Sequence, residues 1–94
     1  MKTAKKLPQA VALRYRQSLD SSPVVTAKGQ GPIARRILQK AEESGVAVLR
    51  DPQLSEMLMN LEINDPIPEK AFSALAEIYA FLIETDDRYA AVFK

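Results

Sequence analysis

Residues 24–49 read VVTAKGQGPIARRILQKAEESGVAVL, and this stretch decides the fold. It opens with the β-branched run Val24-Val25-Thr26, which favours a strand. It closes with a second short apolar run, Val46-Ala47-Val48-Leu49. Between the two runs, apolar residues recur at the spacing of one helical face. These residues are Ile33, Ile37, Leu38 and Ala41. The stretch therefore predicts a strand, a helix and a second strand, with the two strands parallel.

The ends of this helix carry their own signals. Pro32 suits the first helical position, because the N–H that proline lacks has no partner there in any case. At the other end, Gly45 follows Ser44 and can take the left-handed conformation that closes many helices. Gly29-Gln30-Gly31 lacks the third glycine and the Gly-Lys-Ser/Thr of a phosphate loop, so we interpret it as a turn from strand to helix.

The flanking segments complete a small α/β domain. Residues 1–9 are basic and show neither a helical nor a strand period, which predicts a mobile leader. The apolar run from Ala10 to Tyr15 predicts a strand. Asp51 and Pro52 mark the start of a second helix, as N-cap and first helical residue. Pro68 opens a third helix that we expect to run to about Glu84. We therefore expect a three-stranded mixed sheet with a βαβ unit and about three flanking helices over residues 10–85. Residues 86–94 are interpreted as a C-terminal tail or an extension of the last helix.

The composition excludes several classes of protein. The chain has 94 residues, enough for one domain, and contains neither cysteine nor histidine. Disulfides and thiolate metal sites are therefore impossible, and the commonest general base is missing. No apolar run approaches the ~20 residues that a membrane helix needs. We expect a cytoplasmic, monomeric protein that is not an enzyme, inserts into no membrane, and has no metal, cofactor or small-molecule substrate.

The charge is distributed unevenly along the chain. Residues 1–50 hold ten Lys or Arg against three Asp or Glu, and residues 51–94 hold three against nine. The basic half leaves open an alternative function as a small nucleic-acid-binding module. Against it, Tyr15 is the only aromatic residue on a predicted strand, whereas RNA-binding sheets carry aromatic pairs. We expect the two halves to interleave in the fold, so that their charges partly cancel.

Seven fragments of the sequence carry a family resemblance: AVALRY at 10–15, VTAKG at 25–29, Arg36-Ile37, GVAV at 45–48, Asp51-Pro52 with Leu54, Ile67-Pro68, and AEIYAF at 76–81. Taken in order, they resemble the C-terminal cytoplasmic domain of the FlhB/YscU family. That family belongs to flagellar and injectisome type III export machines. Together they extend the resemblance over residues 10–85.

One motif of that family is missing. Family members cleave themselves at Asn-Pro-Thr-His just before the first strand, by cyclisation of the Asn, whereas positions 5–8 here read Lys-Lys-Leu-Pro. The asparagines of this chain are Asn60 and Asn64, far downstream. The resemblance therefore implies a protein without self-cleavage, similar to the stand-alone FlhB-like proteins of the FlhX/YlqH type and to a pre-cleaved FlhB C-terminal domain. Its implied partners are membrane-embedded export gate components or exported flagellar or secretion substrates.

The resemblance also implies a partner-binding patch. The positions that match the family's apolar patch are Ser22, Pro23, Ala76 and Tyr79. Ala76 and Tyr79 are three residues apart and share a helical face. Ser22 departs from the family, which has a small apolar residue there. The alternative is structural: Pro23 starts a strand, and Ala76 and Tyr79 pack on the sheet.

Overall fold

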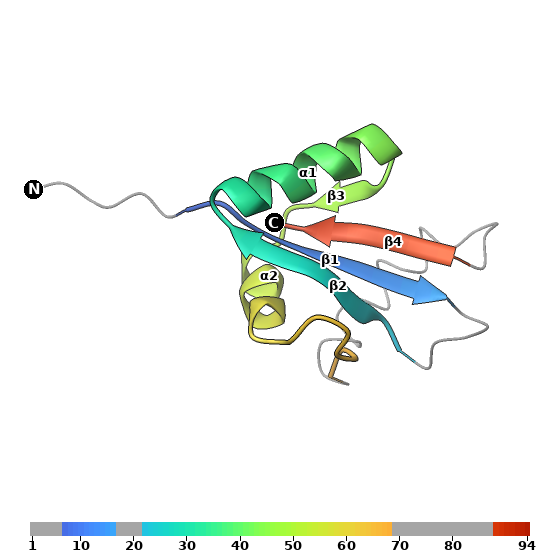
Figure 1. The fold of residues 1–94 in the computed structure, drawn as a ribbon. Helices are drawn as coiled ribbons and strands as arrows, with labels where there is room; N and C mark the ends of the chain where they lie inside the picture. The colour runs from blue at the N-terminus through green and yellow to red at the C-terminus, as the bar shows by residue number, and fades with distance from the viewer. Residues whose placement is uncertain (1–6, 17–21, 69–87) are drawn as a thin grey trace, which may run out of the picture.

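A four-stranded mixed sheet organises the domain. The computed structural model describes residues 7–16, 22–68 and 88–94. Their elements are β1 (Gln9–Arg16), β2 (Val24–Gln30), α1 (Pro32–Ser44), β3 (Ala47–Leu49), α2 (Pro52–Met59) and β4 (Arg88–Phe93). The strands are arranged in the order β2-β1-β4-β3 (Figure 1). Within this sheet β1 is antiparallel to both β2 and β4, and β3 is parallel to β4.

The strand–helix–strand unit predicted from residues 24–49 is present. Its helix α1 has Pro32 in the first turn and ends at Ser44, and Gly45 closes it in the left-handed conformation, with φ 72°. The N–H of Gly45 donates to the carbonyl of Glu42 at 3.3 Å. The strands β2 and β3 run in the same direction, as expected, but β1 and β4 lie between them. The unit is therefore split, and its two strands form opposite edges of the sheet.

The interpretation of residues 86–94 as a tail or helix extension was wrong. Residues 88–93 form β4, an inner strand that pairs with both β1 and β3, so the described sheet has four strands and not three. A short apolar run satisfies both a helical and a strand period, and its pairing partners lie far away in the sequence. Because β4 inserts between strands of the first half, the halves interleave as expected. The third helix, predicted from Pro68 to Glu84, lies outside the described residues.

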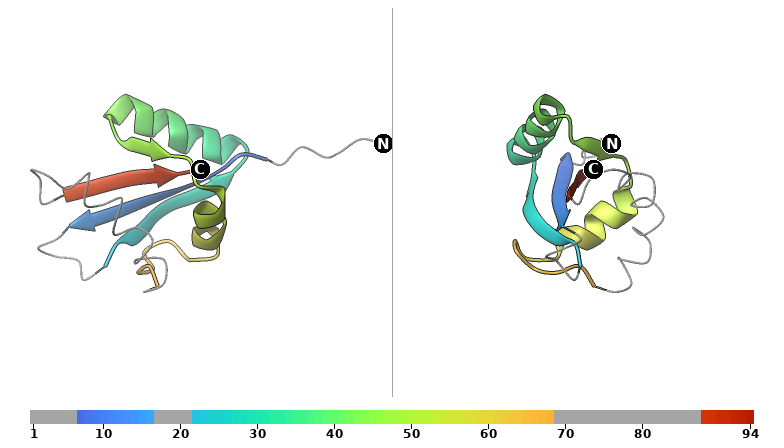
Figure 2. Two further views of the ribbon diagram at one scale, coloured as in Figure 1. Left: turned by 180° about the vertical axis from the view of Figure 1, so that it is seen from behind. Right: turned by 90° about the vertical axis from the view of Figure 1, so that its right-hand side faces the viewer.

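The two helices of the described part, α1 and α2, cover opposite faces of the sheet (Figure 2). On one face the strands pack against α2 in a cluster of buried side chains: Val11, Leu13, Val25, Leu54, Leu58, Ile67, Ala91 and Phe93. On the other face a smaller cluster joins the sheet to α1: Ala10, Ala34, Ala41 and Val92. The alternation of residues 10 to 13 between these two clusters is the period of two that a strand imposes. The domain therefore has three layers, and its larger core lies under α2.

The end of β4 is fixed to the start of α2 through the backbone. Asp51 caps α2 as predicted, because its Oδ1 accepts the N–H of Leu54 at 3.1 Å. The N–H of Asp51 donates to the carbonyl of Lys94 at 2.8 Å, and the N–H of Lys94 donates to the carbonyl of Leu49 at 2.9 Å. In the part of the chain that is described, no helix has the length and apolar character needed to cross a membrane.

Phe93→Ala tests the central position of β4. Phe93 is fully buried, and removing a buried phenyl ring costs about 3–5 kcal/mol, against a total stability of about 5–15 kcal/mol for a small domain. We expect a large fall in the urea midpoint of unfolding. The control is Ala90→Ser on the same strand, where the side chain is exposed and the change should stay within about 0.5 kcal/mol. Equal urea midpoints for the two variants would contradict the position of β4 as an inner strand.

Candidate functional site

Two of the four residues of the predicted partner-binding patch, Ser22 and Pro23, lie within the described part of the chain. Ser22 is half-buried, and Pro23 is fully buried directly before β2. The carbonyl of Pro23 accepts the N–H of Ile67 at 3.0 Å. Ala76 and Tyr79 lie outside the described residues, so the patch stays a prediction. Pro23 fits the structural alternative, because its buried ring helps to start β2 and offers no side-chain surface to a partner in this conformation.

A loop after α2 fixes the start of β2. The N–H of Val25 donates to the carbonyl of Asp65 at 3.1 Å, and the N–H of Asn64 donates to the carbonyl of Val25 at 2.7 Å. Asn64 has φ 78°, in the left-handed region that asparagine tolerates better than most residues. Pro66 forms an isolated bridge with Val24. Ser22 therefore emerges from a segment that is held at several backbone positions.

The segment just before β1 is also fixed. Pro8 accepts the N–H of Gly31 through its carbonyl at 2.8 Å. Gln9 donates from Nε2 to Oγ of the fully buried Ser55 at 2.8 Å. A cavity of about 490 Å³ lies here, with Arg50 and Lys94 among its lining residues. Sequence reasoning did not single out Ser55. Its hydroxyl donates to the carbonyl of Pro52 at 3.2 Å, so its bonds are those of a structural residue.

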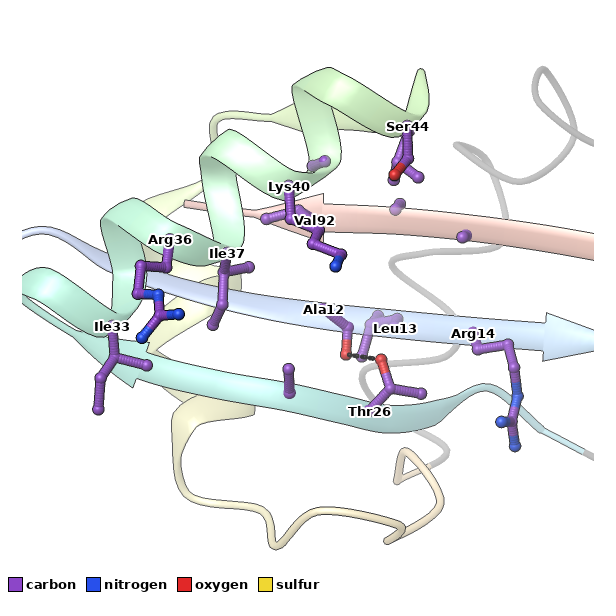
Figure 3. A pocket seen from close by; sticks show the side chains of 15 residues that line it. Ala12, Leu13, Arg14, Thr26, Ile33, Arg36, Ile37, Lys40, Ser44 and Val92 are labelled. Carbon is purple, nitrogen blue, oxygen red and sulfur yellow. Dashed lines mark hydrogen bonds between the residues drawn. The ribbon is translucent and has the colours of Figure 1, made fainter.

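A groove of about 610 Å³ lies between α1 and the sheet (Figure 3). Three of its lining residues are alanines of three different strands: Ala12, Ala27 and Ala90. The side of the groove is formed by α1, with Ile33 and Ile37 among its residues. Among the described residues that line it, the cations are Arg14, Arg36 and Lys40, and none is Asp or Glu. We call this feature the α1 groove.

A register shift between β1 and β2 forms part of this groove. Ala12 pairs with Ala27, whereas Leu13 pairs with Val25, so Thr26 is an extra residue in β2. Without the shift, Val25 and Ala27 would lie on the same face of the sheet. With it, Val25 joins the core under α2 and Ala27 lines the α1 groove. The Thr26 hydroxyl donates to the carbonyl of Ala12 at 3.3 Å across the shift (Figure 3).

Sequence reasoning did not find the α1 groove, because four separate elements contribute to it. The available signals were the spacing of Arg36 and Lys40, one helical turn apart, and alanines where strands usually carry larger residues. The described residues thus define a small three-layer α/β domain with an apolar, cation-lined groove.

Comparison with known proteins identifies the family. The model of the FlhB HrpN YscU SpaS family matches residues 8–82, so the chain belongs to this family. The uncharacterised protein YlqH of Bacillus subtilis (strain 168) is 36% identical over 87 residues, which cover 93% of this chain and 94% of YlqH. The crystal structure of the PscU C-terminal domain matches with a TM-score of 0.73 and 32% identity, over 79% of this chain and 95% of that domain. The expected family and fold are therefore confirmed.

The coverage differs between relatives. Flagellar biosynthetic protein FlhB of Aquifex aeolicus (strain VF5) is 40% identical over 75 residues, which cover 79% of this chain but 21% of FlhB. The chain therefore spans about a fifth of FlhB and nearly all of YlqH. What it shares with PscU is the C-terminal domain of that protein.

Tyr79→Asp tests the predicted patch. If Tyr79 is an interface anchor, a charge in its place should weaken binding to the export components that the resemblance implies roughly tenfold or more, since anchors of this kind dominate binding energy. Circular dichroism and the urea midpoint should stay close to those of the unmodified chain. Tyr79→Phe, which keeps the apolar ring, is the matched control and should bind. A Tyr79→Asp variant that unfolds would show that Tyr79 belongs to the core.

Proposed function

We propose that this chain is a non-enzymatic accessory protein of flagellar or type III protein export. It acts in the cytoplasm and binds export gate components or exported substrates. One observation carries the proposal: the fold of the family's C-terminal domain is present, while positions 5–8 read Lys-Lys-Leu-Pro where the resemblance places the self-cleavage tetrapeptide. The names of relatives refer to flagellar biosynthesis and to secretion, which supports the export role.

The positions of the two asparagines support the absence of self-cleavage. Asn60 is the C-cap of α2, and its Nδ2 donates to the carbonyl of Glu56 at 3.4 Å. Asn64 lies in the loop that fixes β2. Asparagine cyclisation breaks the chain at the asparagine itself, so neither residue can cut the segment before β1. In this proposal the domain keeps its binding surfaces and performs no chemistry.

Mass spectrometry tests the loss of self-cleavage. The unmodified chain should stay intact during prolonged incubation without protease. The matched variant carries Lys5→Asn, Lys6→Pro, Leu7→Thr and Pro8→His, which restores the tetrapeptide in the position before β1. We expect this variant to break after position 5, because the scaffold around Gln9 and Gly31 is retained. A spontaneous break of the unmodified chain within residues 4–9 would contradict the proposal.

Complementation tests the export role. The host is a flagellated bacterium that has lost motility because its FlhB keeps its membrane part and lacks its C-terminal domain. We expect the chain to co-isolate with export gate components and to restore part of the swimming halo. The control is the Phe93→Ala variant, which should co-isolate less and restore less motility because its folded state is destabilised.

The alternative function has its own outcome. A folded chain that neither co-isolates nor restores motility would contradict the export proposal. A gel-shift assay with RNA and DNA at near-physiological salt then tests nucleic-acid binding, because weak non-specific binding falls steeply with salt. Salt-resistant binding in that assay would favour the nucleic-acid-binding module.

A further inference from the structure

Among the described residues, those of α1 cover only part of the sheet face beneath this helix. Neighbouring strands lie ~4.8 Å apart, and a helix with its side chains is ~10 Å wide, so one helix covers about two strands. The residues on this face agree with that estimate. Ala12 and Ala27 are half-buried, and Ala90 is exposed although it lies on the inner strand β4. On the opposite face of the sheet, Leu13 of β1 and Ala91 of β4 are buried.

The uncovered surface is apolar and shaped for close approach. Alanines give the sheet side of the α1 groove a low relief, which lets another backbone come near. On the α1 side, Ile33 is 57% exposed and Ile37 is half-buried, so aliphatic surface faces the same space. Apolar side chains that fill this groove of about 610 Å³ would remove its apolar lining from water, which lowers the free energy.

The charged side chains described in the lining of this groove are all cations. Arg36 and Lys40 are exposed on α1, one turn apart, and both line the groove (Figure 3). Among acidic residues of α1, Glu43 shares a small depression with these cations and accepts a hydrogen bond from Gln39 at 3.3 Å. Neither Glu43 nor Glu42 lines the α1 groove. A partner that enters the groove therefore meets a positive edge.

We propose that the α1 groove binds an amphipathic helix of a partner protein, with aliphatic side chains on its buried face and Asp or Glu beside them. Such a helix would lie next to α1 at the usual 8–10 Å between axes and complete the helical layer over the sheet. Its carboxylates would meet Arg36 and Lys40. This surface differs from the predicted patch, and the inference does not rest on the export role.

The shape of the groove favours a helix over a small molecule. Small-molecule sites enclose roughly 70–90% of their ligand. Here Ile33, Lys40 and Ala90 are exposed along the groove, so it is open to solvent. Helices that lay an apolar face into a hydrophobic groove are a recurring mode of peptide recognition.

Nuclear magnetic resonance tests the location of binding. The probe is a synthetic peptide of about 18 residues, long enough to form a helix, with Leu on one face and Glu at the flanking positions. A second peptide carries Lys in place of each Glu. Titrating the acidic peptide into the ¹⁵N-labelled full chain should shift the amides of Ala12, Ala27 and Ala90. The amide of Leu58, in the core under α2, should not move.

A charge-reversal pair tests the role of the cations. Arg36→Glu with Lys40→Glu should weaken binding of the acidic peptide about tenfold, because two peripheral attractions become repulsions. The control combines Arg35→Glu with Arg50→Glu. It makes the same change in net charge at two exposed positions outside the α1 groove and should leave affinity nearly unchanged. All four positions are exposed, so both variants should fold.

The outcomes separate the possible occupants. Shifts confined to the groove, together with a loss in the groove variant alone, support the proposal. Equal binding of the acidic and basic peptides, equal loss in both variants, or no binding would overturn it. Shifts around Leu58 would overturn it as well. Concentration-dependent self-association that Ala90→Glu abolishes would identify a second copy of the chain as occupant and would also overturn it.

Discussion

The pairing of β4 with its two neighbours holds the sheet together. β3 has β4 as its partner in the described sheet, and β4 in turn pairs with β1 over six residue pairs, from Val11–Phe93 to Arg16–Arg88. Without β4, the β1–β2 pair and β3 would be separate pieces, and α1 would connect strands with nothing between them. Phe93 and Ala91 also fill the core under α2, so the same strand supplies both backbone pairing and apolar burial. The stability of this small domain therefore depends on contacts between the two ends of the sequence.

Most of the local structure could be predicted from short-range signals. Pro32 and Gly45 bound α1, and Asp51 caps α2, because these residues act on backbone groups within one turn. The missing information was non-local. From the sequence alone, the β4 segment fits an extension of the last predicted helix. Its pairing with β1 and β3 identifies it as a strand. The partner-binding patch came from resemblance, and half of it lies outside the described residues. The α1 groove draws residues from strands on both sides of β1, so no single segment indicates it.

The entry to β1 shows what the fold retains without the family's cleavage motif. The Pro8 carbonyl bonds to Gly31 at the start of α1, and Gln9 bonds to Ser55 in α2. The first contact uses the backbone carbonyl of position 8 and needs no particular side chain there. The second contact uses two side chains outside positions 5–8. The architecture around the position of the missing motif can therefore persist when the asparagine is replaced. The proposed binding role requires that the fold does not depend on the residues of the cleavage reaction.

The register shift at Thr26 links the core to the α1 groove. One extra residue in β2 sends Val25 into the main core and Ala27 to the opposite face, although strict alternation would place both on one side. A larger residue at position 27 would then fill the groove, whereas a smaller one at position 25 would open the core. Small side chains are thus tolerated at Ala12, Ala27 and Ala90 because the other face of the sheet supplies most of the apolar burial. An underfilled second face on an otherwise well-packed sheet is the arrangement expected where a partner completes the layer.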